Sequence, residues 1–280
     1  MTEIFTREIF DSFQQLGQLQ VVNQWKTWRD AGHSPYRRIA DAGFRCYSQF
    51  EEDGIILYIL TMLGINAGVC VEISCGTGHE CMSANLVINH GFQAFLFDGC
   101  TNNISAAKSF FGSKKDLIAL QPSIHKAWMT RENINHHLMA SCCPCDVDLL
   151  SMDVDGNDYW LWEAIDYISP KICCFETHDW IPSNLSLTIP YRPDFSMLDS
   201  PHSGFRSVSL LAMNRLSKRK GYTLIGAHRH GFNVFYLRND LMNSFFGEVA
   251  VESIHNNAAT RRNQTEMWPQ IAKYPWVTIR

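Results

Sequence analysis

Seven short apolar runs between residues 69 and 237 constrain the fold of this chain more than any other feature of its sequence. The runs are residues 69–74, 94–98, 117–120, 147–153, 172–176, 223–226 and 234–237. Each has the length and composition of a buried strand, and most of the segments between them are long enough for a crossover helix. Strands that alternate with helices form a largely parallel sheet covered on both faces. The sequence therefore predicts a three-layer, Rossmann-like α/β fold.

The last two runs are joined in a different way. Only residues 227–233 separate them, which is too short for a crossover helix, so we expect an antiparallel hairpin at the end of the sheet. A chain of 280 residues suits one α/β domain with added terminal pieces. We expect an N-terminal helical extension over residues 1–46, a catalytic domain over 47–240 and a C-terminal extension over 241–280.

The first 30 residues have the periodicity of a helix. Apolar side chains recur every three or four positions, at Ile4, Phe5, Ile9, Phe13, Leu16 and Leu19. This pattern predicts an amphipathic helix that packs on the core or on a second subunit, so that a homodimer is one expected assembly. Residues 32–47, with Pro35 and Gly43, read as an irregular connection, and acidic residues then open a second helix over residues 55–63.

The composition argues against several classes of function. The sequence has no run of about 18 apolar residues and no basic-then-apolar leader, which predicts a soluble, cytoplasmic protein with no membrane partner. A net charge of -4, with Lys and Arg dispersed among the acids, gives no long-range field that attracts a polyanion. A nucleic-acid partner is therefore disfavoured, and a small or carbohydrate-like molecule fits better.

The ten cysteines suggest neither disulfides nor a structural zinc site. Most of them fall in apolar, strand-like runs, where Cys is usually a small buried hydrophobe. Residues 142–145 hold three more, with His136 and His137 upstream, but they lack the paired C-x-x-C spacing of a zinc site. We expect reduced thiols in a cytoplasmic protein.

The first predicted strand ends in a glycine turn. Ser74, Gly76 and Gly78 follow Glu72, and residues 79–89 could form the next helix. Such a turn brings backbone N–H groups and a helix N-terminus close to a ligand. About twenty residues later the second strand ends in Asp98, where an acid can accept hydrogen bonds from both hydroxyls of a ribose.

A nicotinamide dinucleotide would share the turn and the acid. Its fingerprint, however, needs G-x-G-x-x-G and a phosphate cradle, whereas here Gly78 is followed by His79, Glu80 and Cys81. An adenosine ligand without a charged phosphate is therefore favoured.

Residues 146–158 concentrate carboxylates at the end of a buried strand. Parallel sheets bind ligands at the carboxyl ends of their strands, so Asp153 and Asp155 should lie in the ligand crevice. Asp158 has the position of a helix N-cap, and a solvated acidic loop is the alternative reading of this segment.

The next strand ends in Glu176 and His178, which a neighbouring position in the sheet would place beside Asp153. These three side chains could hold a divalent ion such as Mg²⁺ or Mn²⁺, or they could act as a general-base relay on a hydroxyl. A lone histidine with a structural role is the alternative.

A proline-rich stretch follows over residues 181–205, with Tyr191 and Phe195 among its aromatics. Its composition predicts a long ordered loop over the site, in which Tyr191 could stack on a sugar ring and Asp155 could contact the same molecule. The C-terminal aromatics Trp268, Tyr274 and Trp276 could cover a partner subunit or pack against the sheet.

Together these residues resemble the FkbM-like branch of the class I S-adenosylmethionine-dependent methyltransferases. The resemblance covers about residues 47–240, and it rests on Ser48-Gln49 with Glu52-Asp53-Gly54, on Val71-Glu72 and the glycine turn, on the segment 148–159 and on the hairpin at 221–233. The chain departs from the family at Ser74, where a glycine is usual, and at Glu51, where a small residue is usual.

The resemblance implies a seven-stranded sheet with an antiparallel last strand and S-adenosylmethionine as cofactor. It places Glu72 and the turn of Ser74, Gly76 and Gly78 at the methionine part, Asp98 at the ribose, and Gln49 where it closes the pocket. Members of the family methylate hydroxyls on sugars and natural products, some with a divalent metal. Asp153, Glu176 and His178 are then the catalytic candidates, and Asp153 also borders the cofactor.

Two other functions stay open. A nicotinamide-dependent oxidoreductase or a sugar-nucleotide enzyme could use the same crevice, and the missing third glycine argues against it. A non-catalytic scaffold could keep the fold without the reaction, but the joint presence of Asp98, Asp153, Glu176 and His178 argues against that.

Overall fold

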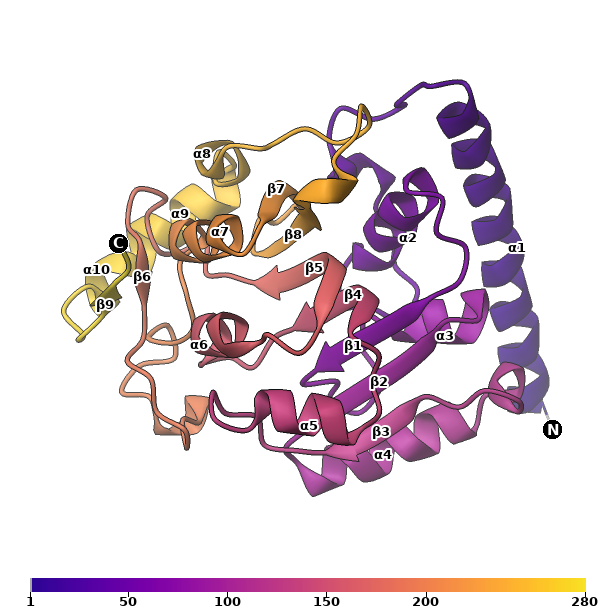
Figure 1. Cartoon of the computed structure of the whole chain (residues 1–280), viewed down its shortest axis with the longest axis horizontal. Helices are drawn as coiled ribbons and strands as arrows, with labels where there is room; N and C mark the ends of the chain where they lie inside the picture. Colours follow the sequence, from indigo (N-terminus) through magenta and orange to yellow (C-terminus); the bar gives the residue numbers. More distant parts are fainter. Residues whose placement is uncertain (1) are drawn as a thin grey trace.

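The computed structural model describes residues 2–280, with side chains described from residue 14 on, and it has three layers (Figure 1). A seven-stranded sheet forms the middle layer, in the order β3-β2-β1-β4-β5-β8-β7. Its strands are β1 (Val69–Ile73), β2 (Gln93–Asp98), β3 (Ser123–Lys126), β4 (Asp146–Met152), β5 (Ser169–Glu176), β7 (Tyr222–Ala227) and β8 (Asn233–Arg238). Neighbours among β1 to β5 pair in parallel, whereas β8 is antiparallel to both β5 and β7. The predicted α/β fold, with its antiparallel last strand, is confirmed.

Helices cover both faces of the sheet. They are α1 (Thr2–Asp30), α2 (Glu52–Met62), α3 (Ala84–His90), α4 (Thr101–Gly112), α5 (Ile134–Ala140), α6 (Asp158–Ala164), α7 (Leu210–Arg219), α8 (Val251–Ile254), α9 (Ala258–Glu266) and α10 (Trp268–Ile271). One hydrophobic cluster joins α1, α2 and α3 to side chains such as Cys70 and Leu96, and a second joins α5, α6 and α7 to side chains such as Val71 and Phe97. Successive residues of a strand point to opposite faces, so each strand contributes to both cores. Among residues 2–280, no helix is long and apolar enough to cross a membrane.

The predicted third strand is wrong. Residues 117–120 lie in a short 3-10 helix (Lys115–Leu117) and the loop after it, and Ile118 is 91% exposed. The third strand is instead β3, an edge strand whose residues Ser-Ile-His-Lys are partly buried or exposed. A strand that buries so little of its surface needs few apolar residues, so its sequence lacks the apolar run used to find the others.

The first helix is present, but the predicted apolar face needs correction. Leu16 and Leu19 are each 53% exposed, whereas Gln18, Val22 and Trp25 are buried against the domain. The other apolar side chains of the predicted stripe, from Ile4 to Phe13, lie outside the described side chains. Packing on a second subunit stays a prediction.

Buried polar contacts hold α1 to α3. The side-chain amides of Gln18 and Asn85 exchange hydrogen bonds of 3.0 and 2.9 Å, and Nε2 of His90 lies 2.7 Å from Oε1 of Gln18. Burial, together with the nearby Lys26 ammonium, lowers the pKa of His90 to about 4. The native state therefore holds His90 neutral, with its ring N–H donating to Gln18.

This histidine should make the protein acid-sensitive. An imidazole whose pKa is lower in the native than in the unfolded state stabilises the fold above pH 6.5, and that stability is lost as the pH falls toward 4, at about 1.4 kcal/mol per pH unit. We expect His90→Gln to flatten the pH dependence of the free energy of unfolding between pH 6 and 4.5, measured by urea denaturation. The exposed His33→Gln variant is the control, and equal slopes in wild type and His90→Gln would contradict the assignment.

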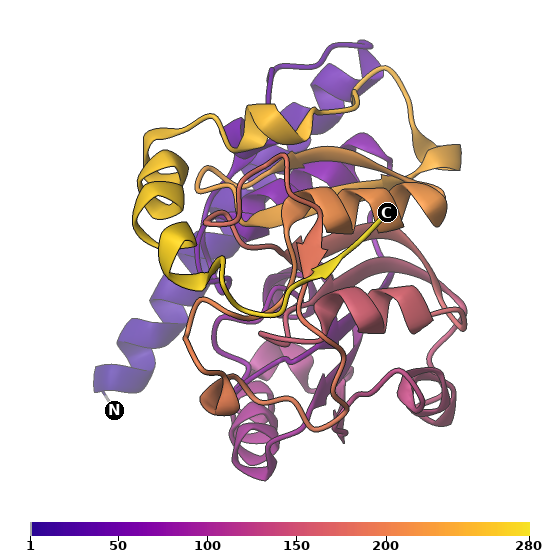
Figure 2. The same ribbon diagram turned by 90° about the vertical axis from the view of Figure 1, so that its left-hand side faces the viewer.

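The C-terminal extension packs on the long loop at 181–205. The short strand β6 (Leu187–Thr188) pairs with β9 (Val277–Thr278), and this pairing lies beside α9 and α10 (Figure 2). A small hydrophobic cluster holds Ile189, Phe195 and Phe205 against Tyr274 and Trp276. The C-terminal aromatics Tyr274 and Trp276 thus pack within the chain, and they hold the loop in place.

Candidate functional site

Two cavities lie at the carboxyl ends of the parallel strands, and they share Ile73 and Ser74 in their walls. The larger, which we call the nucleoside cavity, has a volume of about 250 Å³ and is lined by residues that include Asp98, Asn103, Trp128 and Phe195. The smaller, which we call the acidic cavity, has a volume of about 110 Å³. Its lining residues are Gln49, Glu72, Ile73, Ser74, Glu80, Met82, Ser151, Asp153 and Asn233. The structure therefore brings Gln49, Glu72, Ser74 and Asp153 together as the sequence predicts, with Asp98 in the adjoining space.

Asp98 is held by the glycine turn. Its carboxylate accepts hydrogen bonds from the backbone N–H groups of Gly76, at 3.0 Å, and Cys100, at 2.7 Å, and from the amide of Asn103. An ionised carboxylate has about four lone-pair sites, so Asp98 can still accept hydrogen bonds from a ligand. Gly76 and Gly78 line neither cavity. Gly76 instead orients Asp98, and Gly78 allows Phe110 to approach within 2.8 Å of where a Cβ would stand.

Glu72 occupies the start of the helix after the turn. Its buried carboxylate accepts hydrogen bonds from the backbone N–H groups of Met82, at 3.0 Å, and Ser83, at 2.7 Å, and from the Cys81 thiol. Burial raises its pKa, and these donors partly offset that rise. These N–H groups lie directly before α3, which begins at Ala84, so the carboxylate of Glu72 stands where a phosphate would approach the start of that helix.

Backbone strain accompanies the departure from the glycine pattern. Ser74 has a φ of 72°, in the left-handed region, and so do Glu80 and Asp155, at 57° and 53°. For a residue with a side chain this conformation costs about 1 kcal/mol or more. Ser74 and Glu80 line the acidic cavity, and Asp155 lies two residues after Asp153 of its wall. Backbone strain of this kind is often found in functional sites.

We expect Ser74→Gly to raise the free energy of unfolding by about 1 kcal/mol, because glycine adopts this conformation without a steric penalty. Ser113, which has a φ of -80°, provides a matched control, and Ser113→Gly should destabilise the protein. Urea denaturation of the two variants measures both effects. A lower unfolding midpoint for Ser74→Gly would show that its hydroxyl, rather than its backbone, determines its contribution.

Carboxylates cluster beyond the end of β4. Burial raises the pKa of Asp153, and the neighbouring Asp158 and Asp155 raise it further. Burial also raises the pKa of Glu176 well above its usual range, with Asp153 and Asp155 adding to the effect. Asp158 is the first residue of α6 rather than its N-cap, and it accepts hydrogen bonds from the N–H groups of residues 154 and 156 and from the Ser207 hydroxyl. The acidic segment is therefore an ordered part of the site, not a solvated loop.

One cation that the sequence analysis missed faces this cluster. The Arg206 guanidinium lies 2.7 Å from the Asp155 carboxylate and stacks over the Trp180 ring at 5.7 Å. Its neighbour Ser207 has a φ of 51°. Arg206 follows the long loop, 51 positions after Asp155, so no local pattern in the sequence connects the two residues.

His178 is the nitrogen donor of the site. It is 1% exposed, its ring stacks on Trp180 with centroids 4.0 Å apart, and Nε2 has no hydrogen-bond partner. Burial, with the positive charge of Arg206, holds its pKa well below the usual range. A neutral imidazole with a free nitrogen can accept a proton or bind a metal ion.

The geometry of a metal site favours Asp155 over Asp153. Ligand atoms of Asp155, Glu176 and His178 all lie within 4.8 Å of one another, and no other trio of acidic, His or Cys residues in the described chain does so. The predicted metal set of Asp153, Glu176 and His178 stays a prediction, and this trio shares Glu176 and His178 with it. The cysteines at 142–145 form no such group with His136 and His137.

Tyr191 lies outside both cavities. Its hydroxyl donates to Glu132 at 2.5 Å, and its ring packs beside Trp160 and Arg131. The aromatic residue of the long loop that does enter the nucleoside cavity is Phe195. Hydrogen bonds from Asn157 to the carbonyl of residue 192, at 2.7 Å, and from Trp128 to that of residue 193, at 2.8 Å, hold this part of the loop over the site.

The comparisons with known proteins found similar backbone structures but no similar sequence. No family model and no curated protein sequence matches it. Among solved structures it is similar to an O-methyltransferase from Bacillus cereus in complex with SAH, at 10% identity, 79% coverage of this chain, 89% of that chain and a TM-score of 0.42. It is also similar to the cyclopropane synthase MmaA2 from Mycobacterium tuberculosis, at 13% identity, with 65% of this chain and 66% of that chain covered and a TM-score of 0.37. A third similar structure is the CurJ carbon methyltransferase, at 10% identity, with 69% of this chain and 56% of that chain covered and a TM-score of 0.43. The chain spans less than two thirds of the last two proteins. At such low identities its chemistry has to be argued from its own residues.

Proposed function

We propose that this chain is an S-adenosylmethionine-dependent methyltransferase that methylates a hydroxyl of a small molecule, of sugar or natural-product type. The observation that carries the proposal is the pair of adjoining cavities at the carboxyl edge of the sheet. One is lined by Asp98 and two aromatic side chains, and the other by a group of acids. An elongated ligand with a nucleoside at one end and a cationic amino acid at the other matches both cavities.

The residues fit the parts of this cofactor. Asp98 would accept the ribose hydroxyls, and Trp128 and Phe195 offer apolar surface to an adenine ring. Gln49 and Asn233 carry amides suited to an amino acid group, and the carboxylate of Asp153 is complementary to a sulfonium cation. When bound, S-adenosylmethionine supplies the methyl group as an electrophile.

The rival nucleotide cofactor fits less well. A nicotinamide dinucleotide places its pyrophosphate at the N-terminus of the helix after the first strand. In this chain Glu72 already accepts the N–H groups of residues 82 and 83 there, and its carboxylate would repel a phosphate. The antiparallel β8 between β5 and β7 also differs from the all-parallel order of the dinucleotide-binding fold.

The residues at the ends of β4 and β5 would act on the acceptor. Methyl transfer is an in-line displacement, so the main task is to hold the acceptor oxygen opposite the departing sulfur. The neutral His178 would accept the hydroxyl proton, and Glu176 and Asp153 would stabilise the resulting imidazolium. In the alternative, Asp155, Glu176 and His178 would together hold Mg²⁺ or Mn²⁺, and the ion, instead of His178 as a base, would lower the pKa of the acceptor hydroxyl.

Calorimetric titration with S-adenosylhomocysteine tests the cofactor. We expect the wild-type protein to bind it, and Asp98→Ala to weaken binding about 10- to 100-fold, because hydrogen bonds to a charged group are lost. Asp116→Ala, which removes an exposed acid from the segment after α4, should leave binding unchanged. NAD is titrated in parallel. Binding of NAD without binding of S-adenosylhomocysteine would replace this proposal with the oxidoreductase.

A further inference from the structure

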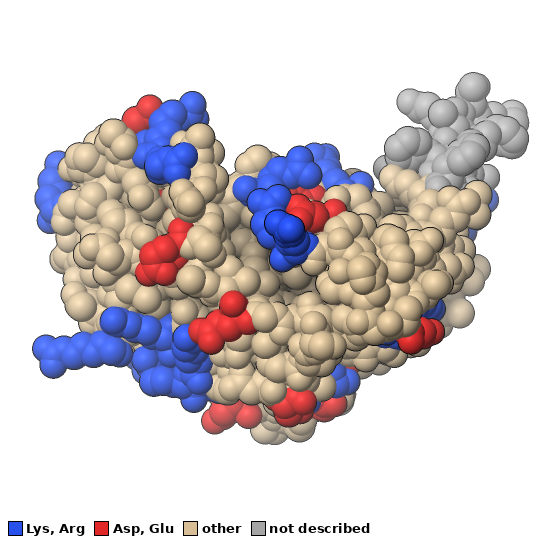
Figure 3. Space-filling view, turned by 90° about the horizontal axis from the view of Figure 1, so that it is seen from above, with Lys and Arg blue, Asp and Glu red and all other residues tan. Residues whose placement is uncertain are grey.

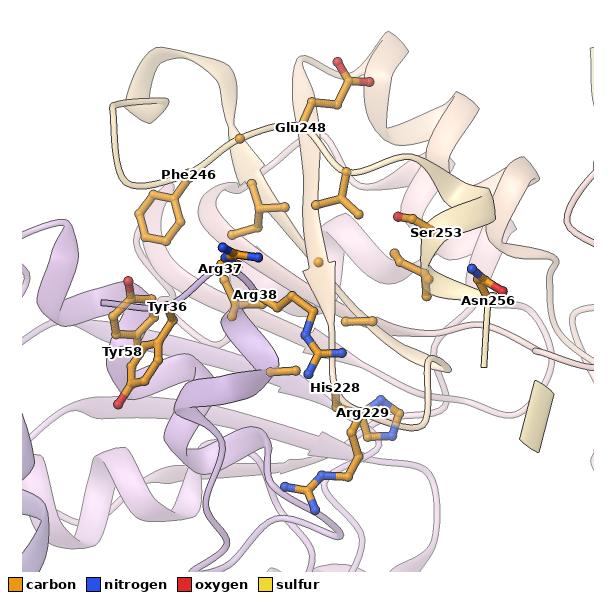
Figure 4. A pocket seen from close by; sticks show the side chains of 18 of the residues that line it. Tyr36, Arg37, Arg38, Tyr58, His228, Arg229, Phe246, Glu248, Ser253 and Asn256 are labelled. Carbon is orange, nitrogen blue, oxygen red and sulfur yellow. The ribbon is translucent and has the colours of Figure 1, made fainter. Parts of the chain in front are cut away.

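A larger cavity, of about 450 Å³, lies along the edge strand β7 and shares no lining residue with the nucleoside or acidic cavity. We call it the edge cavity. Its walls come from residues 36–40 before α2, from Tyr58 in α2, from residues 225–229 at the end of β7, and from residues 245–257 of the C-terminal extension. Figure 4 shows how these segments, far apart in sequence, surround one space. Its volume lies within the usual range for small-molecule sites.

Three arginines line this cavity, namely Arg37, Arg38 and Arg229. Arg38 pairs with Asp41 at 2.7 Å and Arg229 with Glu51 at 3.0 Å, whereas Arg37 has no ion pair among the described residues. In Figure 4 Arg38 extends from the segment before α2 toward His228 and Arg229. In Figure 3 basic side chains lie on two sides of a hollow in the molecular face, with acidic side chains beside them. Guanidinium groups bind phosphate through two parallel hydrogen bonds, so this group of arginines suits a ligand with more than one oxyanion.

The wall of the edge cavity next to the arginines is aromatic. The rings of Tyr36 and Tyr58 meet edge to face with centroids 5.3 Å apart, and Tyr58 meets Phe246 in the same way at 6.3 Å. Tyr58 and Phe246 are almost fully buried and support this wall from behind, whereas Tyr36 and Phe245 are only partly buried and offer apolar surface to the cavity. Ser253 and Asn256 add hydrogen-bonding groups on the far side of the cavity (Figure 4).

We propose that the edge cavity binds a nucleotide-like anion, in which a flat ring system or sugar carries a diphosphate. The arginines would hold the phosphates, and the partly exposed rings of Tyr36 and Phe245 would pack against the body of the ligand. Neither part alone defines the ligand, because a free phosphate leaves the aromatic wall uncovered and a neutral nucleoside leaves the arginines unused. The proposal does not depend on methyl transfer.

Calorimetry with uridine diphosphate tests this site, with pyrophosphate and uridine as partial probes. All titrations contain saturating S-adenosylhomocysteine, which blocks the nucleoside cavity if it binds there. We expect uridine diphosphate to bind more tightly than pyrophosphate, and uridine to give no heat. The double variant Arg37→Gln/Arg38→Gln should weaken binding at least about tenfold, because charge-assisted hydrogen bonds are lost.

Arg262→Gln is the matched control, since Arg262 is an exposed arginine of α9 outside the cavity lining. It should leave the affinity for uridine diphosphate unchanged. The proposal is overturned if uridine diphosphate gives no heat, if the double variant binds it as tightly as the wild type, or if pyrophosphate binds equally well. The loss of affinity in the Arg37→Gln/Arg38→Gln variant can be measured whether or not S-adenosylhomocysteine binds. Failure of this site can therefore be distinguished from failure of the proposed function.

Discussion

Asp153→Asn should lower the rate of methyl transfer about a thousandfold while leaving the protein as stable as the wild type or more so. The carboxylate lines the acidic cavity, and the expected loss is that of a group that stabilises charge at the reacting atoms. The gain in stability has a separate cause. Burial and the nearby Asp158 and Asp155 raise the pKa of Asp153, which means that the native state resists its ionisation.

The pH dependence of the free energy of unfolding provides a second test of Asp153. An acid whose pKa is raised in the native state keeps its proton longer than in the unfolded chain, so the stability of the wild type falls as the pH rises above about 4. An asparagine does not titrate, and the difference between the two proteins should therefore grow with pH. Single-turnover assays and urea denaturation at pH 5 and 8 measure both properties. Full activity in the variant would remove Asp153 from the mechanism, and a loss of activity with unfolding would assign it a structural role.

Gly54→Ala should be the most destabilising of the small substitutions, by about 3 kcal/mol. A Cβ at this position would stand 2.3 Å from the backbone nitrogen of Phe44 and 2.5 Å from the backbone oxygen of Ala42. Gly54 also donates a hydrogen bond of 3.0 Å from its backbone N–H to the carbonyl of Phe44. Backbone atoms cannot rotate away as a side chain can, so α2 would have to separate from the segment that it contacts.

Gly17→Ala is the control for this substitution. Gly17 lies in α1 with nothing within 4 Å of the position of its Cβ, so alanine there should stabilise the helix by about 0.5–1 kcal/mol. Thermal and urea denaturation of both variants give the two changes with opposite signs. A neutral effect of Gly54→Ala would show that the contact between α2 and residues 42–44 relaxes easily.

The sequence predicted the elements whose burial is strong and failed where burial is weak. The central strands were found because both of their faces are covered, so their apolar runs are continuous. The edge strand β3 was missed because it is only partly buried, while the apolar residues 117–120 before it are largely exposed. In α1 the inward side chain at position 18 is an amide, whose partners Asn85 and His90 are more than 60 residues away. No local periodicity can indicate such a contact.

The functional site likewise contains residues that the sequence could predict and residues that it could not. Asp98, Asp153 and Glu176 were predictable because each lies at the carboxyl end of a strand, and the strand directions bring them to one edge of the sheet. Arg206 was not predictable, because its contact with Asp155 depends on the path of the long loop between them. The role of Glu72 in holding the start of α3 also depends on where that helix begins, which the sequence placed several residues too early.

The stacking of Trp180 on His178 makes the site optically observable. An indole ring 4.0 Å from an imidazole lies close enough for its fluorescence to respond when that imidazole gains a proton, binds an ion or changes its orientation. The chain has eight tryptophans, so a Trp180→Phe variant would separate the signal of this one from the rest. Events at the cluster of Asp153, Glu176 and His178 can thus be followed in real time without an added label.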